Sequence, residues 1–275
     1  MKKFTTLVAF DFSKSSSVVL EKAIDFTKKM DGELHVVNVV ESLFFSKKMD
    51  LDSIKERGFL ELAKSFGSIK KENYHCVSGK VKTEVANTAN ILNADVIIMG
   101  NSGETHFLNE FLMGSHTKEI VKNAQTPVLV MKNEHELDYK NILVLTDMSD
   151  ESAAAIKKVT QLFPKSKTTL ANFFYLPIDN NLGLYGLNED DVGEYNERVK
   201  AESQNNLESF LNSLALPSDI SVATASIHSS LNPKLIKDEL KHIKYELLVM
   251  HSKQGVSFFT FDVLEQSEVD VLIVK

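Results

Sequence analysis

Short apolar runs alternate with longer amphipathic segments along the whole chain. Residues 4–10 form one such run, which ends at Asp11, and the next segment, 15–30, carries apolar side chains at helical spacing. The alternation continues with apolar runs at 33–40, 74–77, 95–99 and 127–131 and helical patterns at 51–66, 83–92 and 115–123. The run at 95–99 lacks polar alternation, as strands of a parallel sheet covered on both faces do. The first half thus predicts a doubly wound α/β sheet with right-handed crossovers.

The second half of the chain repeats the first. Asp11 and Ser13 recur as Asp147 and Ser149 at an offset of 147 − 11 = 136 residues, about half of the 275 in the chain. The same order of elements follows, with strands at 140–145, 168–174, 221–227, 246–250 and 269–274 and helices at 152–162, 192–214 and 233–242. We therefore expect two tandem doubly wound α/β domains, each with a parallel five-stranded sheet, at residues 1–137 and 138–275, with their junction in the polar stretch 132–139.

Composition and charge exclude several classes of protein. The chain is 43% hydrophobic and 25% charged, and its 31 basic and 38 acidic residues leave a net charge of −7. That balance disfavours a nucleic-acid partner, which needs a basic face. Asp11 ends the first apolar run too early for a signal peptide, and no run is long enough to cross a membrane. Because the one cysteine, Cys76, cannot form an internal disulfide, we expect a cytoplasmic protein in which that thiol is buried rather than reactive.

The loop after the strand at 95–99 carries residues suited to a phosphate. Gly100 permits close approach of the backbone to a ligand, and Gly103 can adopt a tight turn. Gly114 and Ser115 stand where the next helix begins, and the free amides of a helix N-terminus bind anions without a lysine. At the tip of the first strand, Asp11 can accept hydrogen bonds from ribose hydroxyls or an adenine amino group.

These segments resemble the universal stress protein family. Its adenine-nucleotide-binding members carry Gly, two residues, Gly, nine residues, Gly and then Ser or Thr, with an Asp after the first strand and a closing Pro-Val-Leu-Val strand. Here the corresponding segments are Ala94–Gly103, Gly114-Ser115-His116-Thr117 and Thr126–Lys132. The resemblance implies a Rossmann-like fold of the adenine nucleotide alpha hydrolase type. It also implies a stress-response regulatory role without enzymatic activity, and ATP or AMP as cofactor, with or without Mg²⁺.

The resemblance also implies which residues hold the nucleotide. Ala9, Phe10 and Asp11 would border the adenine and ribose, and Val39 would close the adenine slot. The phosphates and ribose would be lined by Gly100, Ser102, Gly103, Gly114, Ser115, His116 and Thr117. The segment 104–113 has ten residues instead of nine, and Asn101, Ser102 and Glu104 stand where binding members carry a basic or imidazole side chain. We therefore expect weak affinity, or a preference for AMP or adenosine over ATP.

The second half departs further from this pattern. From Met99 to Pro127 the difference is 28, whereas from Met250 to Asp270 it is 20, so eight residues are missing. His251 follows the strand where Gly100 does in the first half. We expect no nucleotide in the second domain.

Several alternatives remain beside this interpretation. The runner-up is an interaction or scaffold protein of the same fold that binds no nucleotide. A slow ATP hydrolase is disfavoured because no Walker lysine occurs.

Ser13 and Ser149 are expected to be helix caps rather than nucleophiles. His106, His116 and His251 lack metal-ligand spacing, so no metal site is expected. The last strands, 127–131 and 269–274, should associate the two domains as a pseudo-dimer, and a homodimer is an open alternative.

Overall fold

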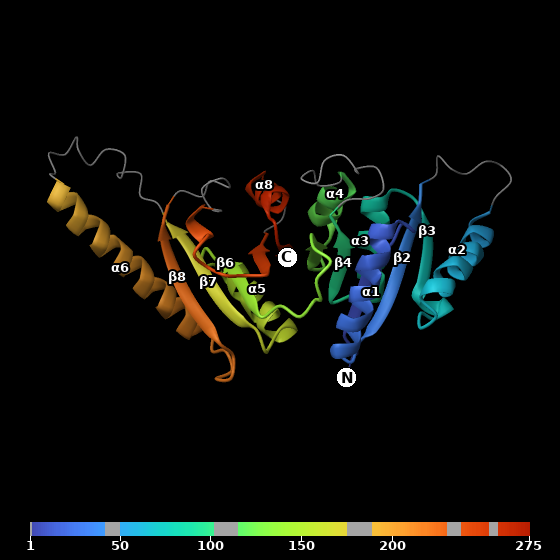
Figure 1. The fold of residues 1–275 in the computed structure, drawn as a ribbon, viewed down its shortest axis with the longest axis horizontal. Helices are drawn as coiled ribbons and strands as arrows, with labels where there is room; N and C mark the ends of the chain where they lie inside the picture. The colour runs from blue at the N-terminus through green and yellow to red at the C-terminus, as the bar shows by residue number, and fades with distance from the viewer. Residues whose placement is uncertain (1, 42–49, 102–114, 175–188, 230–237, 253–257) are drawn as a thin grey trace. The chain divides into compact units, whose positions relative to one another are not determined.

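The computed structural model describes residues 2–41, 50–101, 115–174, 189–229, 238–252 and 258–275. The predicted α/β alternation is confirmed (Figure 1). The first half contains β1 (Thr5–Ala9), α1 (Lys14–Lys29), β2 (Glu33–Val40), α2 (Leu51–Ser65), η2 (Lys71–Asn73), β3 (Tyr74–Ser78), α3 (Val81–Leu92), β4 (Val96–Gly100), α4 (Ser115–Asn123) and β5 (Val128–Met131). The second half contains β6 (Asn141–Leu145), α5 (Asp150–Leu162), β7 (Lys167–Phe174), α6 (Glu189–Ser213), β8 (Val222–His228), β9 (Leu247–His251), α8 (Phe258–Gln266) and β10 (Asp270–Val274).

The described residues divide into two compact units. The first comprises Met1–Asp138 together with Ser252–Lys275, and the second comprises Tyr139–His251. The C-terminal segment therefore makes its contacts within the first unit. There β10 pairs with β5 in antiparallel register, with Val271 opposite Val130 and Ile273 opposite Val128. These are the two strands whose edges the sequence predicts to be covered.

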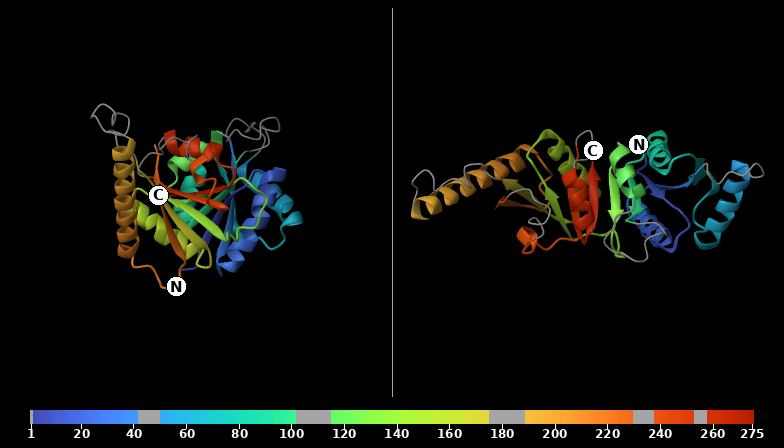
Figure 2. Two further views of the ribbon diagram at one scale, coloured as in Figure 1. Left: turned by 60° about the vertical axis from the view of Figure 1, so that its left-hand side comes forward. Right: turned by 90° about the horizontal axis from the view of Figure 1, so that it is seen from above.

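The first unit is a parallel sheet with helices on both faces. Its strands lie in the order β3-β2-β1-β4-β5, all parallel, and β10 adds the antiparallel edge. Helices α1 and α2 lie on one face and α3 and α4 on the other (Figure 2). Leu7 and Val8 of the central strand are fully buried beside Ile97 and Ile98 of β4, because both faces of these strands are covered. This strand order brings the carboxyl ends of β1, β2 and β4 together at one edge of the sheet.

The second unit repeats this arrangement with its own strands. Its described strands lie in the parallel order β9-β6-β7-β8, which corresponds to β4-β1-β2-β3. The predicted helix at 233–242 lies largely outside the described residues. Helix α8, which the sequence analysis did not predict, fills the shortened segment after β9. This segment contains too few polar residues to show a helical hydrophobic period, so the sequence pattern did not predict a helix there.

The duplication extends to single hydrogen bonds at the end of the first strand of each unit. The amides of Ser13 and Ser149 donate to Asp11 Oδ1 and Asp147 Oδ1 respectively, at 3.0 Å in both cases. The residue between each pair is left-handed, with φ of 64° at Phe12 and 61° at the equivalent Met148. Each serine then caps the next helix, as predicted. Both units thus keep a turn that holds one aspartate at the strand tip.

Within the described part of the chain, no helix is long and apolar enough to cross a membrane. Cys76 is buried, as predicted, and burial raises the pKa of its thiol, so the thiolate form is disfavoured.

Candidate functional site

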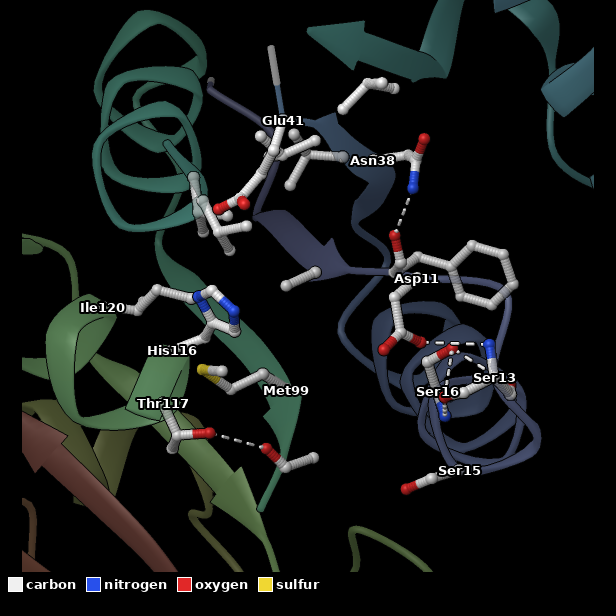
Figure 3. Close-up of a pocket in the computed structure, with 18 residues that line it drawn as sticks. Asp11, Ser13, Ser15, Ser16, Asn38, Glu41, Met99, His116, Thr117 and Ile120 are labelled. Atoms are coloured by element: carbon white, nitrogen blue, oxygen red, sulfur yellow. Dashed lines mark hydrogen bonds between the residues drawn. The ribbon is translucent and has the colours of Figure 1, made fainter. Parts of the chain in front are cut away.

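A pocket of about 410 Å³ lies at the carboxyl ends of β1, β2 and β4 in the first unit (Figure 3). Its volume falls within the range of about 300–1,000 Å³ found for small-molecule sites. One end is aliphatic, formed by Val37 and Val39 of β2 with Val81 and Val85 of α3. The other end is polar, formed by Asp11, the serines that begin α1, Gly100 and the start of α4. A ligand with a flat apolar part and a polar part matches this division.

Asp11 is held in place by the start of α1. Its Oδ1 accepts from the Ser13 amide, and Ser13 Oγ in turn accepts from the Ser16 amide at 3.0 Å. Partial burial raises the pKa of Asp11, but hydrogen bonds from the Ser13 and Ser16 hydroxyls outweigh this and leave the pKa below its usual value. The carboxylate is therefore ionised at neutral pH and exposed as an acceptor at the polar end of the pocket.

Asn38 fixes the backbone just before Asp11. Its Nδ2 donates to the carbonyl oxygen of Phe10 at 2.9 Å, and in the second unit Asn172 donates to the carbonyl of Thr146 at 2.8 Å. A polar residue inside an otherwise apolar strand was the available sequence signal for this contact. The bond positions the strand tip, and through it the aspartate, in both units.

Helix α4 contributes the opposite wall of the pocket. His116, Thr117 and Ile120 line it, so the N-terminal turn of α4 borders the cavity. The buried Thr117 hydroxyl donates to the carbonyl of Asn101 at 3.2 Å and lies 3.4 Å from that of Gly100. This hydroxyl thus ties the end of β4 to α4, whereas the resemblance places Thr117 beside the phosphates and ribose of a ligand. His116 is exposed at the rim.

Among the described residues, two carboxylates and no lysine or arginine line the pocket. Asp11 and Glu41 are the acidic residues of this described lining, and His116 is the only side chain in it that can carry a positive charge. Lys82 of α3 pairs with Glu119 of α4 at 2.8 Å, and Lys118 of α4 pairs with Glu265 of α8. The electrostatic environment therefore favours a ligand with amino and hydroxyl groups over a polyanion.

The structure brings most of the predicted site residues to this one pocket. Those that line it are Ala9, Phe10, Asp11, Val39, Gly100, His116 and Thr117. Ser115 begins α4, with its side chain outside the described residues. Ser102, Gly103 and Gly114 lie outside the described residues altogether. Sequence reasoning missed the other lining residues, which reach the pocket through helix and strand geometry that no local motif records: Ser13, Ser15, Ser16, Val37, Asn38, Val40, Glu41, Val81, Val85, Met99 and Ile120.

In the second unit an imidazole lies against the equivalent aspartate. Strand register aligns His251 with Gly100. Val8 pairs with Ile98, two residues before Gly100, and the equivalent Val144 pairs with Val249, two residues before His251. His251 Nε2 lies 3.3 Å from Asp147 Oδ2. Burial raises the pKa of Asp147, but the hydrogen bonds from Ser149 and the charge of His251 outweigh this and leave the pKa below its usual value. One oxygen of Asp147 thus contacts an imidazole of the chain itself, on a carboxylate that stays 56% exposed.

Metal-ligating side chains do not gather at either strand edge. Among the described residues no group of three or more His, Cys, Asp or Glu could hold a metal ion. His35 of β2 and His75 of β3 form a hydrogen bond of 3.0 Å between His35 Nδ1 and His75 Nε2. Neither residue lines the pocket. His106, for which the sequence predicts no metal-binding role, lies outside the described residues.

Comparisons with known proteins agree with this fold. The profile of the Universal stress protein family matches residues 4–132. A universal stress protein from Methanocaldococcus jannaschii is 29% identical over 139 residues, covering 46% of this chain and 80% of the relative. A protein from Staphylococcus saprophyticus is 29% identical over 140 residues, covering 46% of this chain and 83% of the relative.

Solved structures extend the likeness to both halves. A crystal structure of a universal stress protein from Archaeoglobus fulgidus covers 100% of this chain and 99% of its own, with a TM-score of 0.69 and 19% sequence identity. At that identity the likeness concerns the fold, which both halves of the chain share with it. The profile match thus identifies residues 4–132 as a universal stress protein domain, and the relatives match a similar share of the chain.

Proposed function

We propose that the first unit binds an adenine nucleotide or nucleoside in the pocket between β1, β2, β4 and α4. The observation that carries this proposal is the division of one cavity into a valine-lined end and a polar end that holds Asp11. A purine fits between aliphatic side chains, and an ionised carboxylate accepts hydrogen bonds from ribose hydroxyls. The match of residues 4–132 to the universal stress protein family supports the same class of ligand.

The charges of the site favour adenosine or AMP over ATP. Residues 101–117 include two glutamates and two histidines but no lysine or arginine. The N-terminus of α4 attracts one anionic group, as helix N-termini do. Each additional phosphate near Asp11 or Glu41 would cost about 1–4 kcal/mol at a separation of about 4 Å, between aqueous and near-surface dielectric. One phosphate therefore suits this site better than three.

The second unit is proposed to bind no nucleotide. Asp147 keeps the turn that Asp11 has, but His251 occupies its free side. A ribose would have to displace this contact before it reached the carboxylate. We therefore expect one ligand per chain, with the second unit in a supporting role.

The cellular role follows from binding rather than from catalysis. We propose a cytoplasmic regulator of the stress response whose nucleotide-bound state is read by other components, without a reaction of its own. No nucleophile-base pair lines the pocket among the described residues. The intramolecular pseudo-dimer also stands as a proposal, supported by the antiparallel pairing of β10 with β5.

Isothermal titration of the full chain tests the proposal. ATP, ADP, AMP and adenosine would be titrated with and without Mg²⁺, and we expect AMP or adenosine to bind at least as tightly as ATP. Tighter binding of ATP by about tenfold, equal to about 1.4 kcal/mol, would contradict the charge argument. No binding of any of the four at about 1 mM, a level that detects free energies beyond roughly −4 kcal/mol, would instead favour the scaffold alternative.

A further inference from the structure

Glu41 is the charged residue at the aliphatic end of the pocket. It follows β2 directly, its side chain is half-buried, and it lines the cavity beside valines of β2 and α3. In Figure 3 its carboxylate turns toward α3, whereas the carboxylate of Asp11 lies beside the start of α1. The two acidic side chains therefore face different parts of the same cavity.

Within the described part of the chain, the Glu41 carboxylate has no hydrogen-bond or ion-pair partner. Asp11 differs, because one of its oxygens already accepts from the Ser13 amide. A carboxylate that is partly removed from water and lies against aliphatic side chains is an acceptor without a donor. A ligand that supplies an N–H or O–H donor here would replace the hydrogen bonds from water that the carboxylate loses on burial.

We infer that Glu41 selects the purine by accepting a hydrogen bond from the exocyclic amino group of adenine, an inference that rests on the proposed function. The base occupies the valine end, where Glu41 lies, and the ribose hydroxyls are left to Asp11 at the polar end. A phosphate is repelled by the carboxylate, so it cannot be the group that Glu41 recognises. Hypoxanthine and guanine place a carbonyl oxygen where adenine has its amino group, and two acceptors would then face each other.

The test compares adenosine with inosine, because these nucleosides differ in that one group and carry no phosphate. Both would be titrated into the full-length wild-type chain and into Glu41→Gln. The wild type should prefer adenosine by at least about tenfold, the effect of one hydrogen bond to a charged acceptor. Glutamine can donate to the inosine carbonyl or accept from the adenosine amine, so the variant should bind the two nucleosides within about threefold of each other. Glu61→Gln, an exposed glutamate of α2 outside the pocket, is the matched control and should keep the wild-type ratio.

A second comparison needs no substitution in the protein. N6,N6-dimethyladenosine lacks the N–H donor, and it should bind the wild type about tenfold more weakly than adenosine. If the adenosine-to-inosine ratio is the same in the wild type and in a folded Glu41→Gln, the inference is overturned while the proposed function stands. Equal binding of the dimethylated nucleoside also overturns the inference. If neither adenosine nor AMP binds the wild type, the inference and the proposed function fail together.

Discussion

His251 Nε2 lies 3.3 Å from Asp147 Oδ2, at the place in the second unit where the first unit has Gly100 and an open pocket beside Asp11. The two aspartates occupy the same turn, with the same 3.0 Å bond from a serine amide. A single residue at the end of the fourth strand thus distinguishes a carboxylate beside an open pocket from one that has an imidazole against it. Under the proposed function, this difference separates a binding unit from a supporting one.

The two aspartates should respond differently to the same substitution. Asp11→Asn keeps an oxygen for the Ser13 amide but loses the charge that faces the pocket, so AMP affinity should fall by about 10- to 100-fold, the range for a hydrogen bond to a charged group. Asp147→Asn is the matched control and should leave AMP affinity unchanged. Titration calorimetry of both variants measures this. An equal loss in the two variants would show that the second unit takes part in binding.

Placing the imidazole of the second unit into the first should close the pocket. In Gly100→His the new side chain would lie where His251 does, against Asp11, and AMP binding should fall below detection. Gly193→His is the control, because a side chain at that helical position meets nothing within 4 Å. Thermal unfolding of both variants would establish that they fold. Wild-type affinity in Gly100→His would contradict the assignment of the site.

The hydrogen-bonded pair His35–His75 should make stability depend on pH. Burial lowers the pKa of both imidazoles; the charge of Glu33 partly opposes this at His35, and His35 and Lys55 add to it at His75. The unfolded chain then binds more protons than the folded one, so the free energy of unfolding should fall as pH drops below about 6.5, the usual value for histidine. Urea unfolding between pH 7 and 5 should show a smaller fall in His75→Phe.

The control for this pair is His135→Gln, which removes an exposed histidine from the first unit. It should keep the wild-type dependence on pH. If His75→Phe instead follows the wild type over the whole range, the pair does not titrate with folding.

Gly58 of α2 should be coupled to Tyr74 of β3. A methyl group on Gly58 would overlap the Tyr74 hydroxyl, which is buried without a hydrogen-bond partner among the described residues. Gly58→Ala should therefore destabilise the wild type by about 1–3 kcal/mol through overpacking. In the Tyr74→Phe background the clashing hydroxyl is gone, so the same change should cost less. The higher helix propensity of alanine, about 1 kcal/mol over glycine, then offsets part of what remains. A double-mutant cycle measured by urea unfolding gives the coupling, and strict additivity of the two changes would refute it.

The fold was predictable because buried parallel strands show as apolar runs. The predicted bounds of β2 and α4 agree with the structure, and other elements shift by a few residues at their ends. Helix α8 was missed because its apolar residues show no helical period.

The site was predictable only in part. Asp11 and Gly100 stand at strand ends, where the topology of parallel sheets places ligands, so their positions carried information. Glu41 also follows a strand, but a single acidic residue after a strand is common in loops. The contact between His251 and Asp147 depends on the direction of a side chain, which no spacing in the sequence records.

Hydrogen–deuterium exchange of the full chain with and without AMP tests the central claim most directly, because it locates the ligand in one unit or the other. Binding should slow exchange at the end of β1 and the start of α1 (residues 9–16), after β2 (37–41) and in the first turns of α4 (116–120). It should leave the equivalent segments of the second unit, 146–152 and 247–251, unchanged. Protection in those segments, or protection nowhere at saturating AMP, would contradict the account.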